Sequence, residues 1–423
     1  MASDSEQEGA AVARFAGHRL GEPGYRRISV ALFAAGLATF ALLYCTQPLL
    51  PELAGSFGVS AASSTLTVSL CTAALGLSML VAGPTSEVVG RTGLMRWSLV
   101  AATVVGLLCA AAPSWPVLLV LRAVQGITLA GLPAIAIAYL REEVHPDSHA
   151  GASGLYIGGT ALGGMIGRLI AGGLADVGGW RLALAGIGGL GIVCAVVVIA
   201  LLPASRNFTP VPAEPRRIAR MTVRVLADPV LMALYGVAAV LMGAFVAVYN
   251  AVGFRLTGPP YQLSIAVAGL VFCVYPLGTF SSAYAGRLAD RFGRRPVEPV
   301  ACVLMLAGVL LTLAPQLWLI VLGLAVMTAG FFAAHGVASG WVAARAQLGA
   351  GGTAQAASLY LFGYYLGSSV FGGLAGVAWS GGGWTWVVVE TAALTVAGLA
   401  LALALYRSRS LLESGRTPPP VAY

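Results

Sequence analysis

Four side chains that carry a charge or readily take up a proton lie inside long apolar runs of this chain. They are two arginines, one histidine and the only carboxylate well inside such a run: Arg122, Arg168, His335 and Glu390. A charged side chain at the centre of a membrane-spanning helix costs roughly 2.5–3.5 kcal/mol on insertion scales, so it needs a partner or a water-filled cavity. The chemistry open to these four side chains is ion pairing, proton transfer or the binding of a charged solute.

The two buried arginines lie at a similar predicted depth in successive apolar runs. Their guanidinium groups could together bind an anionic group through paired hydrogen bonds. For Arg122 the alternative is a structural role, in which it donates hydrogen bonds to backbone carbonyl groups. For Arg168 the alternative is that its side chain extends toward the membrane surface and touches no substrate. We expect Arg168 to contact substrate.

Glu390 and His335 are candidates for carrying or relaying a proton. A carboxylate in an apolar helix can serve as a proton carrier, and histidine ordinarily changes its charge between pH 5 and 8. The alternatives are that Glu390 pairs with an arginine and that a neutral His335 hydrogen-bonds between helices. The first apolar run has no acidic residue between Ile28 and Pro51, so it offers no carboxylate for this role.

Further polar groups lie on otherwise apolar segments and could contact a substrate. For each tyrosine the alternative is ordinary aromatic packing. The predicted substrate contacts besides Arg168 are Tyr44, Gln47, Asn250, Tyr275, Tyr360 and Tyr364.

The elements that must position these residues are membrane-spanning helices. Hydrophobic residues are 58% of the 423 residues and charged ones 9%, against about 25% charged in soluble proteins. Apolar stretches of about 20 residues are long enough to cross a bilayer as helices, whereas barrel strands are about ten residues long and alternate in polarity. We predict an all-α polytopic fold with spans near 28–50, 63–82, 94–112, 115–140, 151–175, 181–203, 229–252, 264–285, 297–314, 317–340, 355–379 and 384–406.

The arginines predict the orientation of these spans. The chain has no lysine, and most of its arginines lie in loops on one side, which the positive-inside rule places in the cytoplasm together with both termini. The formal charge of +8 thus records topology and does not indicate a nucleic-acid partner. The predicted order is a disordered tail and no signal peptide, a six-helix half, a linker, a second six-helix half and a tail: 1–27, 28–203, 204–228, 229–406 and 407–423.

The residue patterns of a metal site, a disulfide framework or an enzyme are not found in the sequence. All six cysteines lie in apolar runs without CxxC spacing, and His335 has no nucleophile or metal-ligand pattern around it. We therefore predict no cofactor, no metal and no enzymatic activity.

Two charged loops indicate that the chain contains one unit twice. The loop GRLADRFGRRP (286–296) has a weaker copy, GPTSEVVGR (83–91), at an offset of 203 residues, and the runs at 151–175 and 355–379 match at an offset of 204. Two parallel six-helix repeats would place a substrate site between them, near the membrane midplane. Glycines spaced for close helix contact recur in the two matching runs; they are Gly159, Gly163, Gly164, Gly167, Gly363 and Gly367.

These motifs resemble those of the major facilitator superfamily. The loop at 286–296 is similar to the full loop signature of that family, and Arg122-x-x-Gln125-Gly126 is similar to its second signature. The glycines from Gly159 to Gly167 resemble the signature of drug/proton antiporters, with departures at Gly164 and Arg168. The segments 44–53, 130–146 and 359–369 are similar to YnfM-like efflux transporters of bacterial inner membranes.

The resemblance implies how the charged loops and Arg122 act. In the family such loops are thought to latch the cytoplasmic side, and Arg122 would take part in proton coupling. The first loop departs from the pattern at Glu87 and Val88, so it is expected to be the weaker latch. The predicted gating residues are Gly83, Glu87, Gly90, Arg91, Gly286, Asp290, Arg291, Gly293, Arg294 and Arg295.

The predicted function is secondary active transport. We expect a monomeric, twelve-span facilitator of the bacterial inner membrane that exports a small molecule, a drug or a metabolite, in exchange for protons. A proton-coupled importer on the same fold is the alternative, and a non-transporting sensor is a more distant one. The glycine signature of 151–175 favours export, whereas Arg122 and the charged loops fit either direction.

Overall fold

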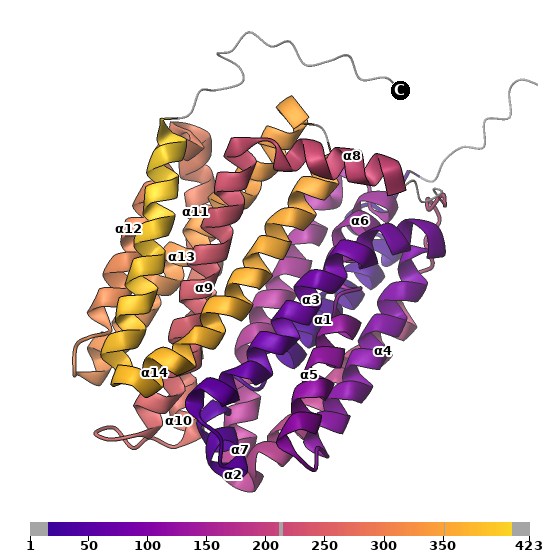
Figure 1. Cartoon of the computed structure of the whole chain (residues 1–423). Helices are drawn as coiled ribbons and strands as arrows, with labels where there is room; N and C mark the ends of the chain where they lie inside the picture. The colour runs from indigo at the N-terminus through magenta and orange to yellow at the C-terminus, as the bar shows by residue number, and fades with distance from the viewer. Residues whose placement is uncertain (1–15, 211–214, 351, 408–423) are drawn as a thin grey trace, which may run out of the picture.

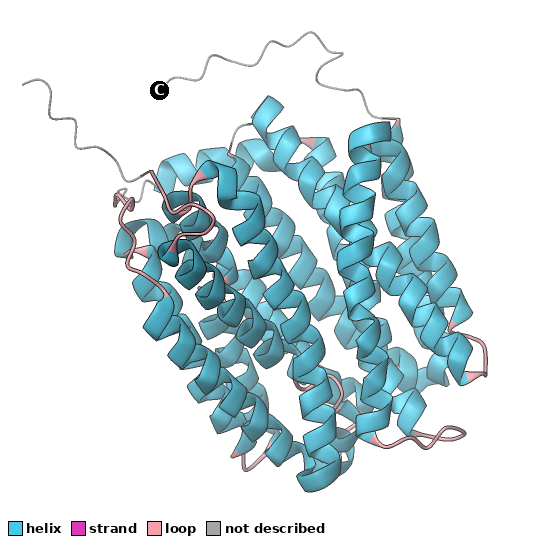
Figure 2. Cartoon of the chain, turned by 180° about the vertical axis from the view of Figure 1, so that it is seen from behind, coloured by secondary structure: helices cyan, strands magenta, loops and turns pink. Residues whose placement is uncertain are grey.

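The structure, a computed structural model, describes residues 16–210, 215–350 and 352–407, and this part of the chain contains helices and no strands (Figure 2). The first half contains α1 Pro23–Tyr44, α2 Leu50–Phe57, α3 Ala61–Val89, α4 Arg91–Ala110, α5 Trp115–Leu129, α6 Pro133–Glu143, η1 Pro146–Ser148 and α7 His149–Leu201. The linker helix is α8 Pro215–Leu226. The second half contains α9 Pro229–Thr257, α10 Ile265–Gly269, η2 Leu270–Val274, α11 Tyr275–Phe292, α12 Arg294–Leu311, α13 Leu317–Arg345, η3 Ala346–Ala350 and α14 Thr353–Tyr406.

The apolar helical segments match the predicted spans in part. Within the described residues, nine helical segments are long and apolar enough to cross a membrane, and two of them, of 56 and 54 residues, are about twice the necessary length. Each of these two contains a break, so each forms two spans. Helix α12 lies at the predicted span 297–314 but is not among these nine segments, so the count of twelve spans stays a prediction.

The two breaks occur at equivalent positions of the two halves. Helix α7 is interrupted at Gly178 and Gly179, and α14 is interrupted at Gly382 and Gly383. The second glycine of each pair has a positive φ, 75° and 62°, which side chains with a Cβ rarely adopt. The offset of 204 residues is the one found between the matching sequences, so the duplication extends to the backbone turns.

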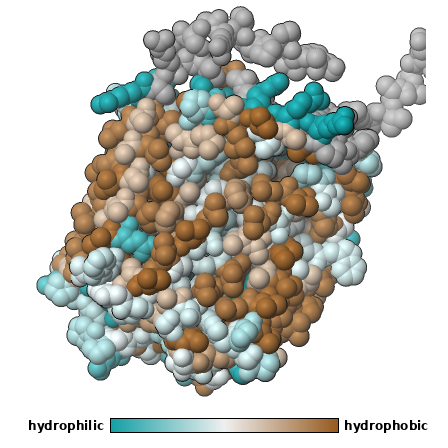
Figure 3. Space-filling model, in the orientation of Figure 1, coloured by the Kyte–Doolittle hydropathy of each residue, from teal (hydrophilic) through white to brown (hydrophobic). Residues whose placement is uncertain are grey.

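The two halves lie side by side, and the linker helix α8 runs across one end of the molecule (Figure 1). We call this end the loop side, because the charged turns at Gly90 and Gly293 also lie there. The opposite side carries α2 and α10. Between the two ends the surface is mostly apolar, with exposed side chains such as Trp97 and Phe280, as expected for contact with lipid (Figure 3).

The described part of the N-terminal tail packs against the first half. Helix α1 begins at Pro23, inside the segment predicted as a disordered tail, and the backbone of His18 bonds to Glu143 and His145. The linker also differs from a plain coil, because α8 forms an amphipathic helix within it. Residues 1–15 and 408–423 of the predicted tails lie outside the described residues.

Glycines bring the long helices into close contact within each half. In the first half, Gly159, Gly163 and Gly167 of α7 pack directly on the backbone of α1. In the second half, Gly363 and Gly367 of α14 pack on the backbone of α9 in the same way. A larger side chain at these positions would separate the helices, which explains why the repeated pattern consists of small residues.

The halves meet each other through α3 with α14 and through α7 with α10. Thr65 donates to the Gly373 carbonyl at 3.1 Å, and Ser369 donates to the Ser69 carbonyl at 2.7 Å. The carboxylate of Asp176 accepts from the first two backbone N–H groups of α10, at 3.0 and 3.1 Å. These contacts close the molecule on the side opposite the charged loops.

Candidate functional site

Arg168 is the centre of a polar network that joins the two halves. Its side chain is 2% exposed; Nε donates to Oε1 of Gln47 at 2.6 Å, and Nη1 donates to the Gly164 carbonyl. Gln47 in turn donates to Oδ1 of Asn250 at 2.7 Å, and Asn250 donates to the Gly372 carbonyl at 2.8 Å. The network therefore connects α7, the segment after α1, α9 and α14.

Aromatic rings surround the guanidinium group of Arg168. Its central carbon lies 4.5 Å from the ring centre of Tyr44, 4.8 Å from that of Phe272 and 4.9 Å from that of Tyr275. The rings stabilise the charge through their negative faces. Among the described residues, Arg168 forms no ion pair, and the buried hydroxyl of Tyr44 has no hydrogen-bond partner. Within the described residues the site therefore holds one buried positive charge without a carboxylate partner.

The side opposite the charged loops is tightly sealed next to this network. A cavity between the halves is lined by Gln47, Tyr249 and Phe272 among others and has a water-accessible volume of about 10 Å³. That is room for about one water molecule. A solute could reach Arg168 from this side only after the halves separate there.

Arg122 has a different environment and does not join Arg168 in one site. It is fully buried and donates to the carbonyls of Thr67 at 2.9 Å, Leu42 at 3.0 Å and Leu43 at 2.5 Å. Its Nη1 also donates to Oε1 of Gln125 at 2.5 Å. These contacts tie α1, α3 and α5 together, and a role of Arg122 in proton coupling stays a prediction.

Tyr360 and Tyr364, predicted as substrate contacts, lie beside His335 instead of Arg168. The Tyr360 hydroxyl and Nδ1 of His335 are 2.9 Å apart. The centre of the Tyr364 ring lies 4.9 Å from the centre of the imidazole. The predicted polar residues thus form two groups, one around Arg168 and one around His335.

Two carboxylates in the second half are buried without hydrogen-bond partners. One is the predicted Glu390, which is half-buried, and both of its oxygens lack a partner. The other is Glu298 on α12, which is 0% exposed and also lacks any partner for both oxygens. Sequence reasoning missed Glu298 because it lies three residues after Arg295, at the edge of a predicted span. Its place directly before an uninterrupted apolar run was the available signal.

The charged loops form one-residue turns between antiparallel helices. Gly90 joins α3 to α4 with φ 106°, and Gly293 joins α11 to α12 with φ 88°. In the first turn, Nη2 of Arg91 lies 2.6 Å from Oε1 of Glu142 in the same half. Glu87 and Asp290, the acidic residues of the predicted latch, are exposed and form no hydrogen bond or ion pair within the described chain. The remaining gating residues are Gly83, Gly286, Arg291, Arg294 and Arg295, all exposed or partly exposed.

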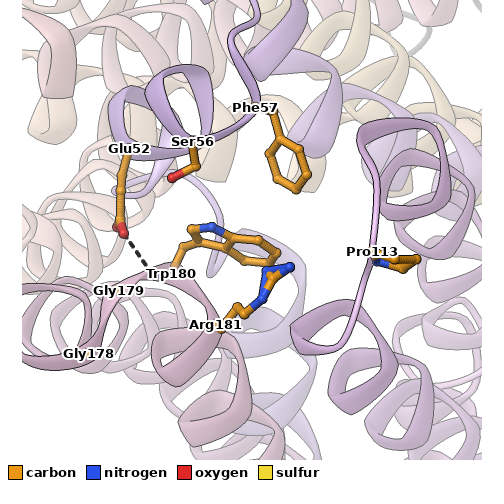
Figure 4. A pocket seen from close by; sticks show the side chains of 8 residues that line it. All are labelled: Glu52, Ser56, Phe57, Pro113, Gly178, Gly179, Trp180 and Arg181. Atoms are coloured by element: carbon orange, nitrogen blue, oxygen red, sulfur yellow. Dashed lines mark hydrogen bonds between the residues drawn. The ribbon is translucent and has the colours of Figure 1, made fainter.

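A larger pocket of about 530 Å³ lies on the opposite side, within the first half only (Figure 4). Glu52 of α2 points toward the break of α7 and accepts from the Trp180 backbone N–H at 2.8 Å. Burial raises the pKa of Glu52, the hydrogen bond from Trp180 lowers it, and the nearby charge of Asp176 raises it further. Because the second half contributes no lining residue, this pocket does not lie between the halves.

Comparisons with known proteins agree with this architecture. The family model of the Major Facilitator Superfamily matches residues 29–281. The MFS-type transporter YybF of Bacillus subtilis is 43% identical over 88% of this chain and 91% of its own length. The inner membrane transport protein YnfM of Escherichia coli is 43% identical over 92% of each chain.

Solved structures share the fold at low sequence identity. A bacterial homologue of the human lysosomal transporter Spinster, in an inward-facing and occupied conformation, has a TM-score of 0.73 and 16% identity, over 91% of this chain and 96% of its own. The nucleoside transporter NupG has a TM-score of 0.69 and 14% identity, over 89% of this chain and 98% of its own. The helical halves, the matched family model and the 43% identical transporters lead to one conclusion: this chain is a multi-pass membrane transporter that belongs to the major facilitator superfamily.

Proposed function

We propose that this transporter exports a small organic molecule with an anionic group across the bacterial inner membrane, driven by proton entry. The observation that carries the proposal is Arg168, a buried cation at the junction of the halves that has aromatic and amide neighbours and no carboxylate. An anionic solute would supply the missing charge, and the rings of Tyr44 and Tyr275 would pack on its apolar part.

The distribution of contacts between the halves supports alternating access. The hydrogen bonds of Asp176, Thr65 and Ser369 lie on one side, while Asp290 and Glu87 on the other side are unpaired. We assign the loop side to the cytoplasm, as the arginine distribution predicts. In the alternate state the loops would pair across the halves, and the opposite side would open and release the solute.

Proton coupling is supported by the buried carboxylates of the second half, which have no permanent partner. The glycine signature of α7, including Gly163 and Gly164, favours export. A proton-coupled importer is the second candidate, because the name of the relative YnfM states inner-membrane transport without a direction.

A substrate screen in everted membrane vesicles tests this function. Vesicles that contain the protein are acidified inside, and aromatic carboxylates are added one at a time while a pH-sensitive dye reports the internal pH. An exporter that exchanges solute for protons raises the internal pH, whereas vesicles without the protein give no response. A further fall in internal pH would identify symport and contradict the proposal, as would the absence of any response to anionic compounds.

A further inference from the structure

Glu298 is a fully buried carboxylate that no contact explains. Among the described residues neither of its oxygens has a hydrogen-bond partner, although the side chain is 0% exposed near the loop-side end of α12. An ionised carboxylate in such surroundings is very unfavourable, and removing both oxygens from water without replacement is already costly. A group of this kind is a candidate for changing its protonation or its partner during function.

The packing of α12 on α13 places Glu298 at the level of His335. The two helices are antiparallel; Gly308 packs on Gly323 and Met327, and Gly330 packs on Ala301 and Met305. One turn further along this contact, α12 presents Glu298. The matching turn of α13 contains residues 334–338, which include His335.

Tyr360 of α14 contacts His335 and lies on a helix that packs against α12. Its hydroxyl is 2.9 Å from Nδ1 of His335. Tyr360 is 2% exposed, so bulk water does not separate it from His335. Three helices thus bring a carboxyl, a phenol and an imidazole to one level of the second half.

We propose that Glu298 takes up and releases the coupled proton and that Tyr360 and His335 relay it to the space between the halves. This inference rests on the proposed proton-driven transport. In the described state Glu298 has no hydrogen bond to Tyr360. The relay operates when the two side chains meet: the carboxyl of Glu298 then gives its proton to the Tyr360 oxygen, while the Tyr360 hydroxyl gives its proton to Nδ1 of His335. His335 then loses a proton to the space between the halves, so that no bond other than O–H and N–H is made or broken.

Aromatic contacts connect the relay with Arg168. The His335 ring stacks with Phe331 at 6.0 Å, and Phe331 stacks with Phe245 at 4.1 Å. Phe245 lies 5.7 Å from Tyr275, whose ring centre is 4.9 Å from the guanidinium carbon of Arg168. A change in the protonation of His335 can therefore affect the surroundings of Arg168 through directly packed rings.

Within the part of the chain that the structure describes, no cation forms an ion pair with Glu298. On its own helix Cys302 is the interacting titratable group, and Arg294 and Arg295 one turn earlier form no ion pair with it. On α13, Arg345 is paired with Asp228 at 2.9 Å. Helix α11 ends in exposed charged residues, which are Arg287, Asp290 and Arg291.

A distance measurement that needs no substrate tests the proposal. Spin labels are attached to cysteines at Val89 and Phe292, exposed residues that end α3 and α11 on the loop side, in protein whose native cysteines are replaced. We expect the distance distribution of the purified protein in lipid to change with pH. Glutamine imitates a protonated carboxyl. Glu298→Gln should therefore show, at every pH, the distance distribution that the unsubstituted labelled protein has at low pH.

Matched variants give each result a definite meaning. Glu298→Asp, which keeps the carboxyl, should keep the pH response, and so should Asp147→Asn, which removes an exposed carboxylate. A pH response that persists in Glu298→Gln, is lost only in Glu390→Gln, or is absent from the unsubstituted labelled protein overturns the proposal.

A transport assay distinguishes a failure of this inference from a failure of the proposed function. In the vesicle assay, Glu298→Gln should lose the proton response to an aromatic carboxylate that elicits one from the native protein. Exchange of the labelled for the unlabelled compound should continue. If the native protein gives no proton response, the proposed function fails; if the native protein responds and Glu298→Gln responds equally, only the assignment of Glu298 fails.

Discussion

Arg122 and Arg168 have the same side chain and a similar burial, yet their neighbours differ. The two arginines therefore differ in their ability to bind a further group. Backbone carbonyls and Gln125 accept from Arg122, so its donors are already committed. Arg168 has aromatic rings, Gln47 and one carbonyl around it. The sequence could indicate that both arginines are buried but not which neighbours each would have, because those neighbours come from other helices.

Replacing Arg168 should distinguish substrates by charge. Arg168→Gln removes the positive charge and should weaken transport of aromatic carboxylates at least tenfold, because charged hydrogen bonds contribute about 1.5–3 kcal/mol. Competition by anionic and neutral compounds in the vesicle assay measures the effect. Arg168→Lys should retain part of the activity, and Arg26→Gln, at an exposed arginine, should retain all of it. Equal losses for anionic and neutral compounds would contradict a role in charge recognition.

Glu52 should make stability depend on pH in a defined direction. Burial raises its pKa above the ordinary value of 4.5, so the folded protein binds this proton more tightly than the unfolded chain. The stabilisation is complete below the ordinary value and is lost as pH rises through the raised value. Glu52→Gln keeps an oxygen to accept from Trp180 and should remove this dependence.

The melting temperature in detergent checks the Glu52 prediction. The difference between native protein and Glu52→Gln should shift in favour of the variant as pH increases from about 4.5 toward neutrality. Glu22→Gln, at an exposed carboxylate, serves as the control. A difference that is constant across this range would show that Glu52 titrates alike in the folded and unfolded states.

At the scale of elements, replacing a glycine should have different effects at different positions of helix α7. A Cβ at Gly163 would overlap the backbone of Leu37 on α1, whereas one at Gly173 would meet open space. Gly163→Ala should therefore separate the helices and cost about 1–3 kcal/mol. Gly173→Ala should be neutral or stabilising by up to about 1 kcal/mol, because alanine favours helix.

Thermal unfolding of the two alanine variants in detergent tests this difference. The Gly163 variant should melt several degrees below the native protein, and the Gly173 variant at or above it. Equal melting temperatures for the two variants would mean that α1 and α7 tolerate separation and that the close contact is not required for stability.

The spans were predictable from the sequence because apolar length alone determines a membrane-spanning helix. The ends of the helices and the breaks within α7 and α14 were harder to predict from the sequence. Helix α1 begins at Pro23 because proline favours the first turn of a helix, although residues 23–27 are polar enough to suggest a tail. The helix within the linker was also missed, since its amphipathic pattern lies in a segment rich in arginine and proline.

At the scale of the molecule, the predicted site divided into two groups. Tyr44, Gln47, Asn250 and Tyr275 gather around Arg168, while Tyr360 and Tyr364 gather around His335. The duplication predicts an interface between halves, and this explains why polar residues on several helices converge. The level of each residue depends on how helices slide along one another, and a sequence without its structure does not specify that.

The unpaired Asp290 leads to a prediction about the state in which the loop side is closed. If Asp290 pairs across the halves only in that state, Asp290→Asn should destabilise it by about 1.5 kcal/mol or more. The population of the state described here should then rise about tenfold relative to the loop-side-closed state. The distance distribution between labels at Val89 and Phe292 measures this ratio, with Asp147→Asn as the control. An unchanged distribution would exclude Asp290 from the latch.

The seal opposite the charged loops has a consequence for the energy source of the cycle. Among the described residues five hydrogen bonds join the halves there, from Gln47, Thr65 and Ser369 and to Asp176. At about 1 kcal/mol net for each, separating the halves costs about 5 kcal/mol. One elementary charge that crosses a membrane voltage of 100 mV supplies about 2.3 kcal/mol of electrical work. The electrical work of two charges is therefore of the size needed to open the seal, while each helical half remains intact.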